Sequence, residues 1–323
     1  GVIQLIWILF NLKKNKSTLG FEIPKLKMFI KPSSNIKRFF VLLLPAIIGN
    51  GAYQLNLLID MILASTLPDG SISFLYYSDR VNQLPLGVLG IAISTALLPI
   101  LSKEVKQGKI KQATKSITKA IKFGIFFSVP SLFGILFLSE EIISFLFYRG
   151  AFGVNDVTLT AKALVALGFG LPAFIMIKIL VVPFFANENT KTPIKISLFC
   201  IAINLILNLI LIGHFLHVGL AIATSVSAWI NMTILIYFLV TYEKYSFDKS
   251  IFTLIFKVLL ASTMMAIVLY LVMDKGILSF IGLDLINENI LLIITIILGL
   301  LTYLISSYII GVEKPYNKKW RQE

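Results

Sequence analysis

Residues 39–101 read FFVLLLPAIIGNGAYQLNLLIDMILASTLPDGSISFLYYSDRVNQLPLGVLGIAISTALLPIL. Two apolar runs, 39–67 and 71–101, flank the turn sequence Pro68-Asp69-Gly70. Each run exceeds the ~20 residues that an α-helix needs to cross a hydrocarbon core. The stretch therefore predicts a hairpin of two membrane-spanning helices.

The same pattern continues along the chain. Further apolar runs of spanning length occupy 120–147, 158–186, 193–213, 218–241, 251–273 and 288–312. The chain is 57% hydrophobic, which is typical of a polytopic membrane protein and not of a soluble domain. We predict an all-α transmembrane bundle of eight full spans plus the end of a ninth, because the apolar start at 1–11 is too short to span. We expect the chain to be the C-terminal part of a longer protein.

The net charge of +13 is concentrated in alternate loops. Lysine and arginine gather in 12–38, 102–119, 187–192, 242–250 and the tail, whereas 68–70, 148–157, 214–217 and 274–287 have few. Under the positive-inside rule this alternation predicts a cytoplasmic C-terminus, and it disfavours nucleic-acid binding as the reason for the charge. We interpret 102–119 as a solvated cytoplasmic connector. The alternative is an interfacial helix on anionic lipid.

The domain organisation follows from these spans and loops. We predict a truncated helix end at 1–11, a basic cytoplasmic linker at 12–38, a six-helix core at 39–241, two additional helices within 242–312, and a cytoplasmic tail at 313–323. Prolines inside spans are expected to bend their helices, and they are Pro45, Pro85, Pro130 and Pro172.

Residues suited to enzyme chemistry are scarce. His214 and His217 fall in a short outer loop without carboxylate or thiolate neighbours, so they predict no metal site. Cys200 lies in an apolar run and is interpreted as a small buried hydrophobe. The acids of the outer side are unpaired in sequence, and they include Asp274, Asp284 and Glu288. The chain is therefore not expected to be an enzyme, although a membrane-bound transferase is one alternative.

Charged residues inside the spans are the first functional candidates, because such residues are costly in a membrane and usually face a cavity or a partner. At 1.5 Å per residue, Asp60 lies about 12 Å and Arg80 about 15 Å from the turn at 68–70. Two interpretations follow. In the first, Asp60 and Arg80 form a buried ion pair. In the second, Arg80 binds an anionic substrate through its guanidinium while Asp60 binds a cation or a proton.

Neighbours of Arg80 extend this candidate site. Asp79 points about 100° away around the helix and is a further intramembrane charge. Gln83 and Gly87 share the face of Arg80. Gly87 and Gly90 would let either a ligand or a second helix approach closely.

A second cluster contains Asn204 and Asn208, which share a helix face at i and i+4. Beyond the next turn, Thr224 reaches a matching depth. Amide, hydroxyl and carboxylate oxygens suit a hard cation such as sodium, whereas hydrogen bonding between helices is the alternative. Lys178 is a further charge within a span, and either reaches the headgroups or faces an inward-open cavity.

Several motifs resemble the MurJ/MviN family of lipid II flippases. They are Leu44-Pro45-Ala46-Ile47-Ile48-Gly49, Tyr76-Tyr77-Ser78-Asp79-Arg80, Leu84-Pro85-Leu86-Gly87-Val88-Leu89-Gly90-Ile91-Ala92, Leu97-Leu98-Pro99-Ile100-Leu101-Ser102, Phe185-Ala186, Lys191-Thr192-Pro193 and Val218-Gly219-Leu220-Ala221. The resemblance runs over nearly the whole chain and is weakest after residue 245.

The resemblance implies a fold and an activity. The family has fourteen helices in two lobes, belongs to the multidrug/oligosaccharidyl-lipid/polysaccharide exporter superfamily, and moves undecaprenyl-pyrophosphate-linked peptidoglycan precursor across the bacterial inner membrane by alternating access. This chain would hold about the C-terminal 60% of such a transporter. Its implied partners are lipid II, membrane lipids and the missing N-terminal lobe.

The resemblance also implies residue roles. Arg80 would contact the pyrophosphate. The family's sodium site corresponds here to Asp60, Asn204, Asn208, Leu220 through its carbonyl, and Thr224. Where that site has a second acidic residue, this chain has Asn208. The alternatives are another exporter of the superfamily, for drugs or polysaccharide repeats, and a non-transporting membrane scaffold.

Overall fold

The computed structural model describes residues 54–243, 245–246, 248, 250–273 and 287–312, together with Trp7 and Phe10. The chain divides into two units, Gly1–Leu44 and Pro45–Glu323. The helices from Gln54 onward belong to the second unit. The predicted linker at 12–38, the tail at 313–323, and Pro45, Asp274 and Asp284 lie outside the described residues.

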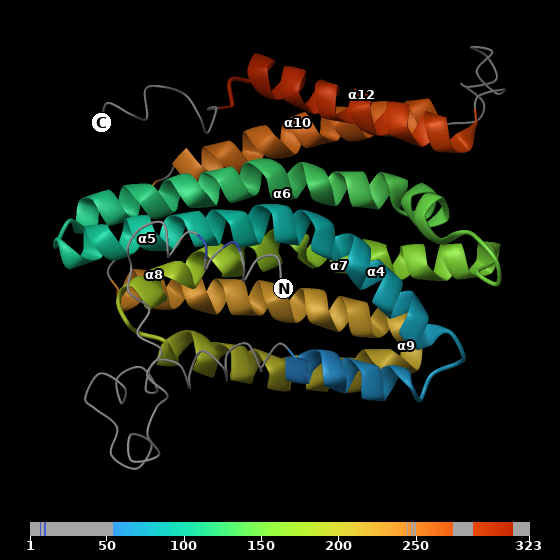
Figure 1. The fold of residues 1–323 in the computed structure, drawn as a ribbon, viewed down its shortest axis with the longest axis horizontal. Helices are drawn as coiled ribbons and strands as arrows, with labels where there is room; N and C mark the ends of the chain where they lie inside the picture. Colours follow the sequence, from blue (N-terminus) through green and yellow to red (C-terminus); the bar gives the residue numbers. More distant parts are fainter. Residues whose placement is uncertain are drawn as a thin grey trace. The chain divides into compact units, whose positions relative to one another are not determined.

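The described residues form helices joined by short turns (Figure 1). After the helix Gln54–Ala64, the order is α4 (Ser71–Pro85), the π-helix η1 (Leu86–Ile91), α5 (Ala92–Lys106), α6 (Ile110–Phe147), α7 (Val154–Leu180), α8 (Val182–Ala186), α9 (Lys191–Thr241), α10 (Ser250–Met273) and α12 (Glu288–Ile309). Six helical stretches of the described chain are long and apolar enough to cross a membrane. The predicted all-α class is confirmed for these residues.

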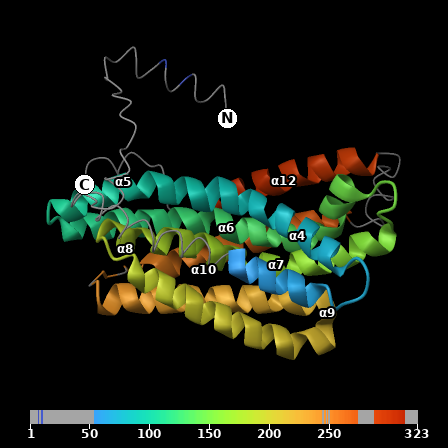
Figure 2. The same ribbon diagram turned by 60° about the horizontal axis from the view of Figure 1, so that its bottom comes forward.

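Helix α9 contains two of the predicted spans. It is 51 residues long, but Leu216 interrupts it with φ 52° and ψ −133°. On either side of the break, Ser227 donates to the carbonyl of Cys200 and Asn204 donates to Thr224, so the two halves run antiparallel (Figure 2). The predicted spans 193–213 and 218–241 correspond to these halves. Of the predicted span 39–67, the structure describes the part from residue 54.

The predicted connector at 102–119 is wrong in extent. Helix α5 continues to Lys106 and α6 begins at Ile110, so only 107–109 lie between them. The Ser116 hydroxyl donates to the Glu104 carboxylate at 3.0 Å and joins the two helix ends. Lysine and glutamine are good helix formers, and these helices can therefore extend past their apolar parts.

The prolines bend the chain less uniformly than predicted. Pro85 is followed directly by the π-helix η1, where the hydrogen-bond pattern widens. In α6 the non-helical backbone falls at Leu138, with φ −124° and ψ 16°, and not at Pro130. Pro172 lies inside α7 without a break in that helix.

Helix α7 forms the centre of the described bundle. In the apolar 18-residue window of Val154–Ala186, which contains α7, 67% of residues are buried, against 17% in the corresponding window of Ser71–Lys106. Small residues permit this close packing: a Cβ added at Gly168 would lie 2.8 Å from Cγ2 of Ile135 in α6. The stretch 71–106 therefore presents an open face, whereas α7 is enclosed by α4, α6 and α9.

Helices α10 and α12 pack on each other and on the side of α6 (Figure 1). The buried Tyr303 of α12 donates its hydroxyl to the carbonyl of Phe126 in α6 at 2.5 Å. Lys257 of α10 donates to the carbonyl of Gly311 just past α12. These contacts attach the last two helices to the core helices.

Candidate functional site

A polar network joins the helix Gln54–Ala64 to both halves of α9. One oxygen of the Asp60 carboxylate accepts the Asn208 amide at 2.7 Å, and the other accepts Asn56 at 3.2 Å and the Thr224 hydroxyl at 3.3 Å. The amide of Asn208 also donates to the side-chain oxygen of Asn204 at 3.0 Å. The amide of Asn204 in turn donates to Thr224 at 3.3 Å.

The helix hairpin explains how residues far apart in sequence meet. Asn204 and Asn208 lie one turn apart on the first half of α9, and the second half returns antiparallel with Thr224 opposite them. Leu220 lies one turn before Thr224 and is buried. Asn204 is 1% exposed and Asn208 is fully buried. The predicted cluster is therefore assembled, and Asp60 belongs to it.

The sequence interpretation missed Asn56. This residue precedes Asp60 by four positions, so both lie on one helix face, and that spacing was the available signal. It supplies the third donor to the carboxylate.

The arrangement is suited to holding positive charge. An ionised carboxylate accepts three hydrogen bonds, and the side-chain oxygen of Asn208 is buried without a hydrogen-bond partner. A buried amide oxygen without a donor is costly unless something else binds it. Carboxylate, amide and hydroxyl oxygens are ligands of hard cations, so the donor set fits such an ion.

Arg80 lies on the open side of α4. Its guanidinium stacks over the ring of Tyr76 at 4.7 Å and donates to the Gln83 side chain at 3.4 Å. The side chain is exposed, and all of its contacts within the described chain come from its own helix. A guanidinium so placed retains donors for an anion.

Of the two interpretations of Asp60 and Arg80, the structure does not show the ion pair among the described residues. The Asp60 carboxylate takes its donors from Asn56, Asn208 and Thr224 instead. Depth along two helices does not fix direction around each axis, and Asp60 faces α9. Gln83 also donates to the Asp79 carboxylate, so it links Asp79 to Arg80 along one helix.

The two glycines after Pro85 differ in surroundings. A Cβ at Gly87 would meet nothing within 4 Å, whereas one at Gly90 would lie 3.5 Å from Lys178 and 3.6 Å from Ile175 of α7. Gly90 therefore serves helix packing, and Gly87 borders open space. The Lys178 side chain packs its aliphatic part beside Gly90 and is otherwise exposed.

The interpretation of His217 as an outer-loop residue needs correction. It is 4% exposed and lies at 3.0 Å from the carbonyl of Leu159 in α7. Its ring is tilted against that of Phe74 in α4, with 5.3 Å between the centroids. The turn of α9 is folded against the bundle, which buries this ring. Cys200 is buried, as predicted, and its thiol is free.

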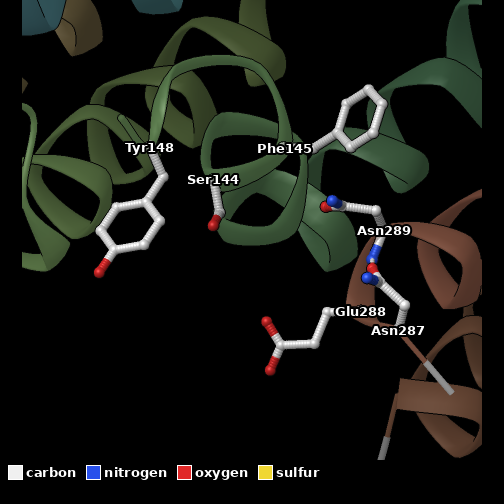
Figure 3. Close-up of a pocket in the computed structure, with 6 residues that line it drawn as sticks. All are labelled: Ser144, Phe145, Tyr148, Asn287, Glu288 and Asn289. Carbon is white, nitrogen blue, oxygen red and sulfur yellow. Dashed lines mark hydrogen bonds between the residues drawn. The ribbon is translucent and has the colours of Figure 1, made fainter. Parts of the chain in front are cut away.

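Two cavities lie outside the network. One, of about 390 Å³, lies between the end of α6 and the start of α12. Figure 3 shows the hydroxyls of Ser144 and Tyr148 and the carboxylate of Glu288 directed into it. The other, of about 690 Å³, lies between α6, α7 and α9. Neither includes Asp60 or Arg80 in its lining.

The comparisons with known proteins agree with this architecture. The sequence model of the family described as "Lipid II flippase MurJ" matches residues 1–285. A probable lipid II flippase MurJ of Rickettsia prowazekii is 39% identical over 84% of this chain and 52% of its own length. The corresponding Rhizobium meliloti protein is 35% identical over 85% of this chain and 50% of its own length. The chain thus spans about half the length of these relatives.

Solved structures give the same result. A lipid II flippase MurJ in an inward closed conformation superposes with a TM-score of 0.71 at 29% identity, covering 94% of this chain and 59% of that one. An outward-facing multidrug resistance MATE transporter of the MOP superfamily has a TM-score of 0.55 at 16% identity, covering 84% of this chain and 66% of that one, which shows the fold alone. The motif-based resemblance is confirmed. The chain is a multi-pass membrane protein chain and belongs to the MurJ family of lipid II flippases.

Proposed function

We propose that the protein containing this chain flips lipid II, an undecaprenyl-pyrophosphate-linked peptidoglycan precursor, across the bacterial inner membrane by alternating access. The observation that carries the proposal is the exposed guanidinium of Arg80 on the open face of α4, without an acidic partner from another described helix. The names of the relatives support the same substrate. The function is transport and not catalysis.

Arg80 is the substrate ligand in this proposal. Its fork of N–H donors matches pyrophosphate oxygens, and stacking on Tyr76 fixes its direction. Gln83 holds the guanidinium from one side. Gly87 leaves room for the headgroup, because a Cβ there would meet nothing within 4 Å. Asp79 and Lys178 are further charges that the cavity would have to accommodate.

A cation such as sodium is proposed to bind at the Asp60 network. Asp60, Asn204, Asn208, Thr224 and the carbonyl of Leu220 would hold it. A bound cation would tie the helix Gln54–Ala64 to the hairpin of α9, and an ion that binds one conformation better than another shifts the population toward it.

The membrane topology is also part of the proposal. It has eight spans, a cytoplasmic C-terminus, and an N-terminal lobe supplied by the rest of the protein.

The transport role is tested by complementation in cells depleted of their own lipid II flippase. The full-length protein carries Arg80→Ala or Arg80→Lys, and Arg149→Ala is the matched control because Arg149 is an exposed cation at the end of α6. Loss of a charge-assisted contact of ~1.5–3 kcal/mol should slow flipping by about 10- to 100-fold. Arg80→Ala should fail to rescue, whereas Arg149→Ala should rescue. Rescue by Arg80→Ala at equal membrane abundance refutes the substrate role.

The cation proposal has its own test. Sodium chloride, but not choline chloride, should raise the thermal midpoint of the purified protein, because a ligand of the native state stabilises it. The sodium effect should vanish in Asp60→Ala and persist in Asp69→Ala, which removes an exposed carboxylate of the nearby turn. Equal sodium responses in both variants contradict the assignment.

A further inference from the structure

The cavity between α6, α7 and α9 is lined by three charged side chains and by apolar ones. The charged side chains are Glu140 and Glu141 of α6 and Lys162 of α7. Seven residues separate Glu140 from the end of α6 and eight separate Lys162 from the start of α7, which gives depths of about 10 and 12 Å. Charges from two helices therefore meet at one level of the membrane.

Most of the apolar lining lies deeper than these charges, whereas Phe215 and Val218 lie near the α9 turn. Phe137 precedes Glu140 by about one turn of α6, while Val165 and Phe169 follow Lys162 by about one and two turns of α7. Ile222 of α9 completes this side of the cavity. Polar groups at one depth with an apolar channel beneath them match the order of headgroup and acyl chain in a phospholipid.

The charged groups have no partners among themselves. Within the described chain, no hydrogen bond or ion pair joins Lys162 to either glutamate, and both Lys162 and Glu140 are exposed. Carboxylates at such a depth are costly without a counter-charge. The cavity lining carries two negative charges and one positive charge, so it favours a headgroup with a cationic donor and disfavours a purely anionic one.

We propose that this cavity binds a zwitterionic aminophospholipid. Its primary ammonium donates to Glu140 and Glu141, its phosphate accepts from Lys162, and one acyl chain lies along Phe137, Val165 and Phe169. The cavity volume of about 690 Å³ accommodates part of a lipid, not all of it, so the second chain lies in the surrounding bilayer. This site is separate from the face of Arg80 and does not depend on what the protein transports.

Native mass spectrometry of the purified full-length protein tests the proposal. The probes are phosphatidylethanolamine, phosphatidylcholine and phosphatidylglycerol with identical acyl chains. Phosphatidylethanolamine should be retained best, because the trimethylammonium of phosphatidylcholine cannot donate to carboxylates and phosphatidylglycerol is anionic. Lys162→Gln should lower phosphatidylethanolamine retention by about fivefold, the scale of a partly exposed ion pair. The double variant Glu140→Gln, Glu141→Gln should abolish the preference over phosphatidylglycerol.

Matched controls separate this site from general surface binding. Arg149→Gln, just past the end of α6, and Glu288→Gln, at the start of α12, remove charges outside this cavity and should leave retention unchanged. Val165→Trp keeps the charges and fills the channel, so it should lower retention of all three lipids if the chain lies there. Equal retention of the three lipids by the unaltered protein, or unchanged retention in both Lys162→Gln and Val165→Trp, overturns the proposal.

Discussion

Replacing Asn208 by leucine should destabilise the protein through the Asp60 network. The variant removes the amide that donates to Asp60 at 2.7 Å and to Asn204 at 3.0 Å. It also removes the Asn208 oxygen that is buried without a partner, and leucine has the same branching and the same number of side-chain heavy atoms. The loss is therefore mainly that of two hydrogen bonds.

The magnitude follows from the kinds of bond. The bond to a carboxylate is worth ~1.5–3 kcal/mol, and a neutral side-chain bond between membrane helices averages ~0.6 kcal/mol. The free energy of unfolding should fall by about 2–4 kcal/mol, and the thermal midpoint of a chain of 323 residues by about 3–6 °C. Loss of the donor to Asp60 should account for most of this.

A double-mutant cycle with Asp60→Leu isolates that bond in the purified full chain. The coupling free energy between the two sites should be about 1.5 kcal/mol or more. Asn231→Leu is the control, because Asn231 lies on the same helix and its side chain makes no hydrogen bond among the described residues. A coupling below ~0.5 kcal/mol, which is the usual additivity error, would show that the carboxylate does not depend on Asn208.

Three further changes probe other parts of the structure. Asn208→Asp places a second carboxylate near Asp60, and like charges this close cannot both remain ionised without a counter-ion. Sodium should therefore raise the thermal midpoint of the variant more than that of the unaltered protein. An equal response of the two proteins contradicts this. Gly219→Ala should lower the unfolding free energy by about 1–3 kcal/mol, since the added Cβ would lie 2.6 Å from the carbonyl oxygen of Leu211. Gly213→Ala, with nothing within 4 Å, should be tolerated in the same denaturation assay, and equal losses would refute the steric argument. Tyr303→Phe removes the bond to Phe126 and should cost about 1 kcal/mol, whereas the exposed Tyr270→Phe should cost nothing measurable.

Helical periodicity was sufficient to predict much of the candidate site. Asn204 and Asn208 share a face at i and i+4, and a short turn returns Thr224 to their depth. These regularities depend on helix geometry alone, and the hydrogen bonds among the three residues confirm them. The positions of the apolar helices were predictable for the same reason.

Rotation around each helix axis was not predictable. Asp60 and Arg80 have similar depths, but Asp60 faces α9 and Arg80 faces the open side of α4. The burial of His217 depends on how the α9 turn packs against α4 and α7. The extension of α6 back to Ile110 also escaped prediction, because hydropathy measures the apolar part of a helix and not its aqueous end.

The π-helix η1 accommodates an extra residue between α4, which carries Arg80, and α5. Such a segment contains one residue more than an α-helical turn would need, as a single-residue insertion produces. Deleting one residue from Leu86–Ile91 would restore a regular helix and leave Ser71–Pro85 facing nearly the same way relative to α5, because the π-helix already winds less per residue. Deleting one residue between Arg80 and Pro85 would instead rotate Arg80 by about 100° off the open face, while the remaining side chains of α4 stayed chemically the same. The protein should therefore tolerate a one-residue deletion in η1 better than one in the last turn of α4.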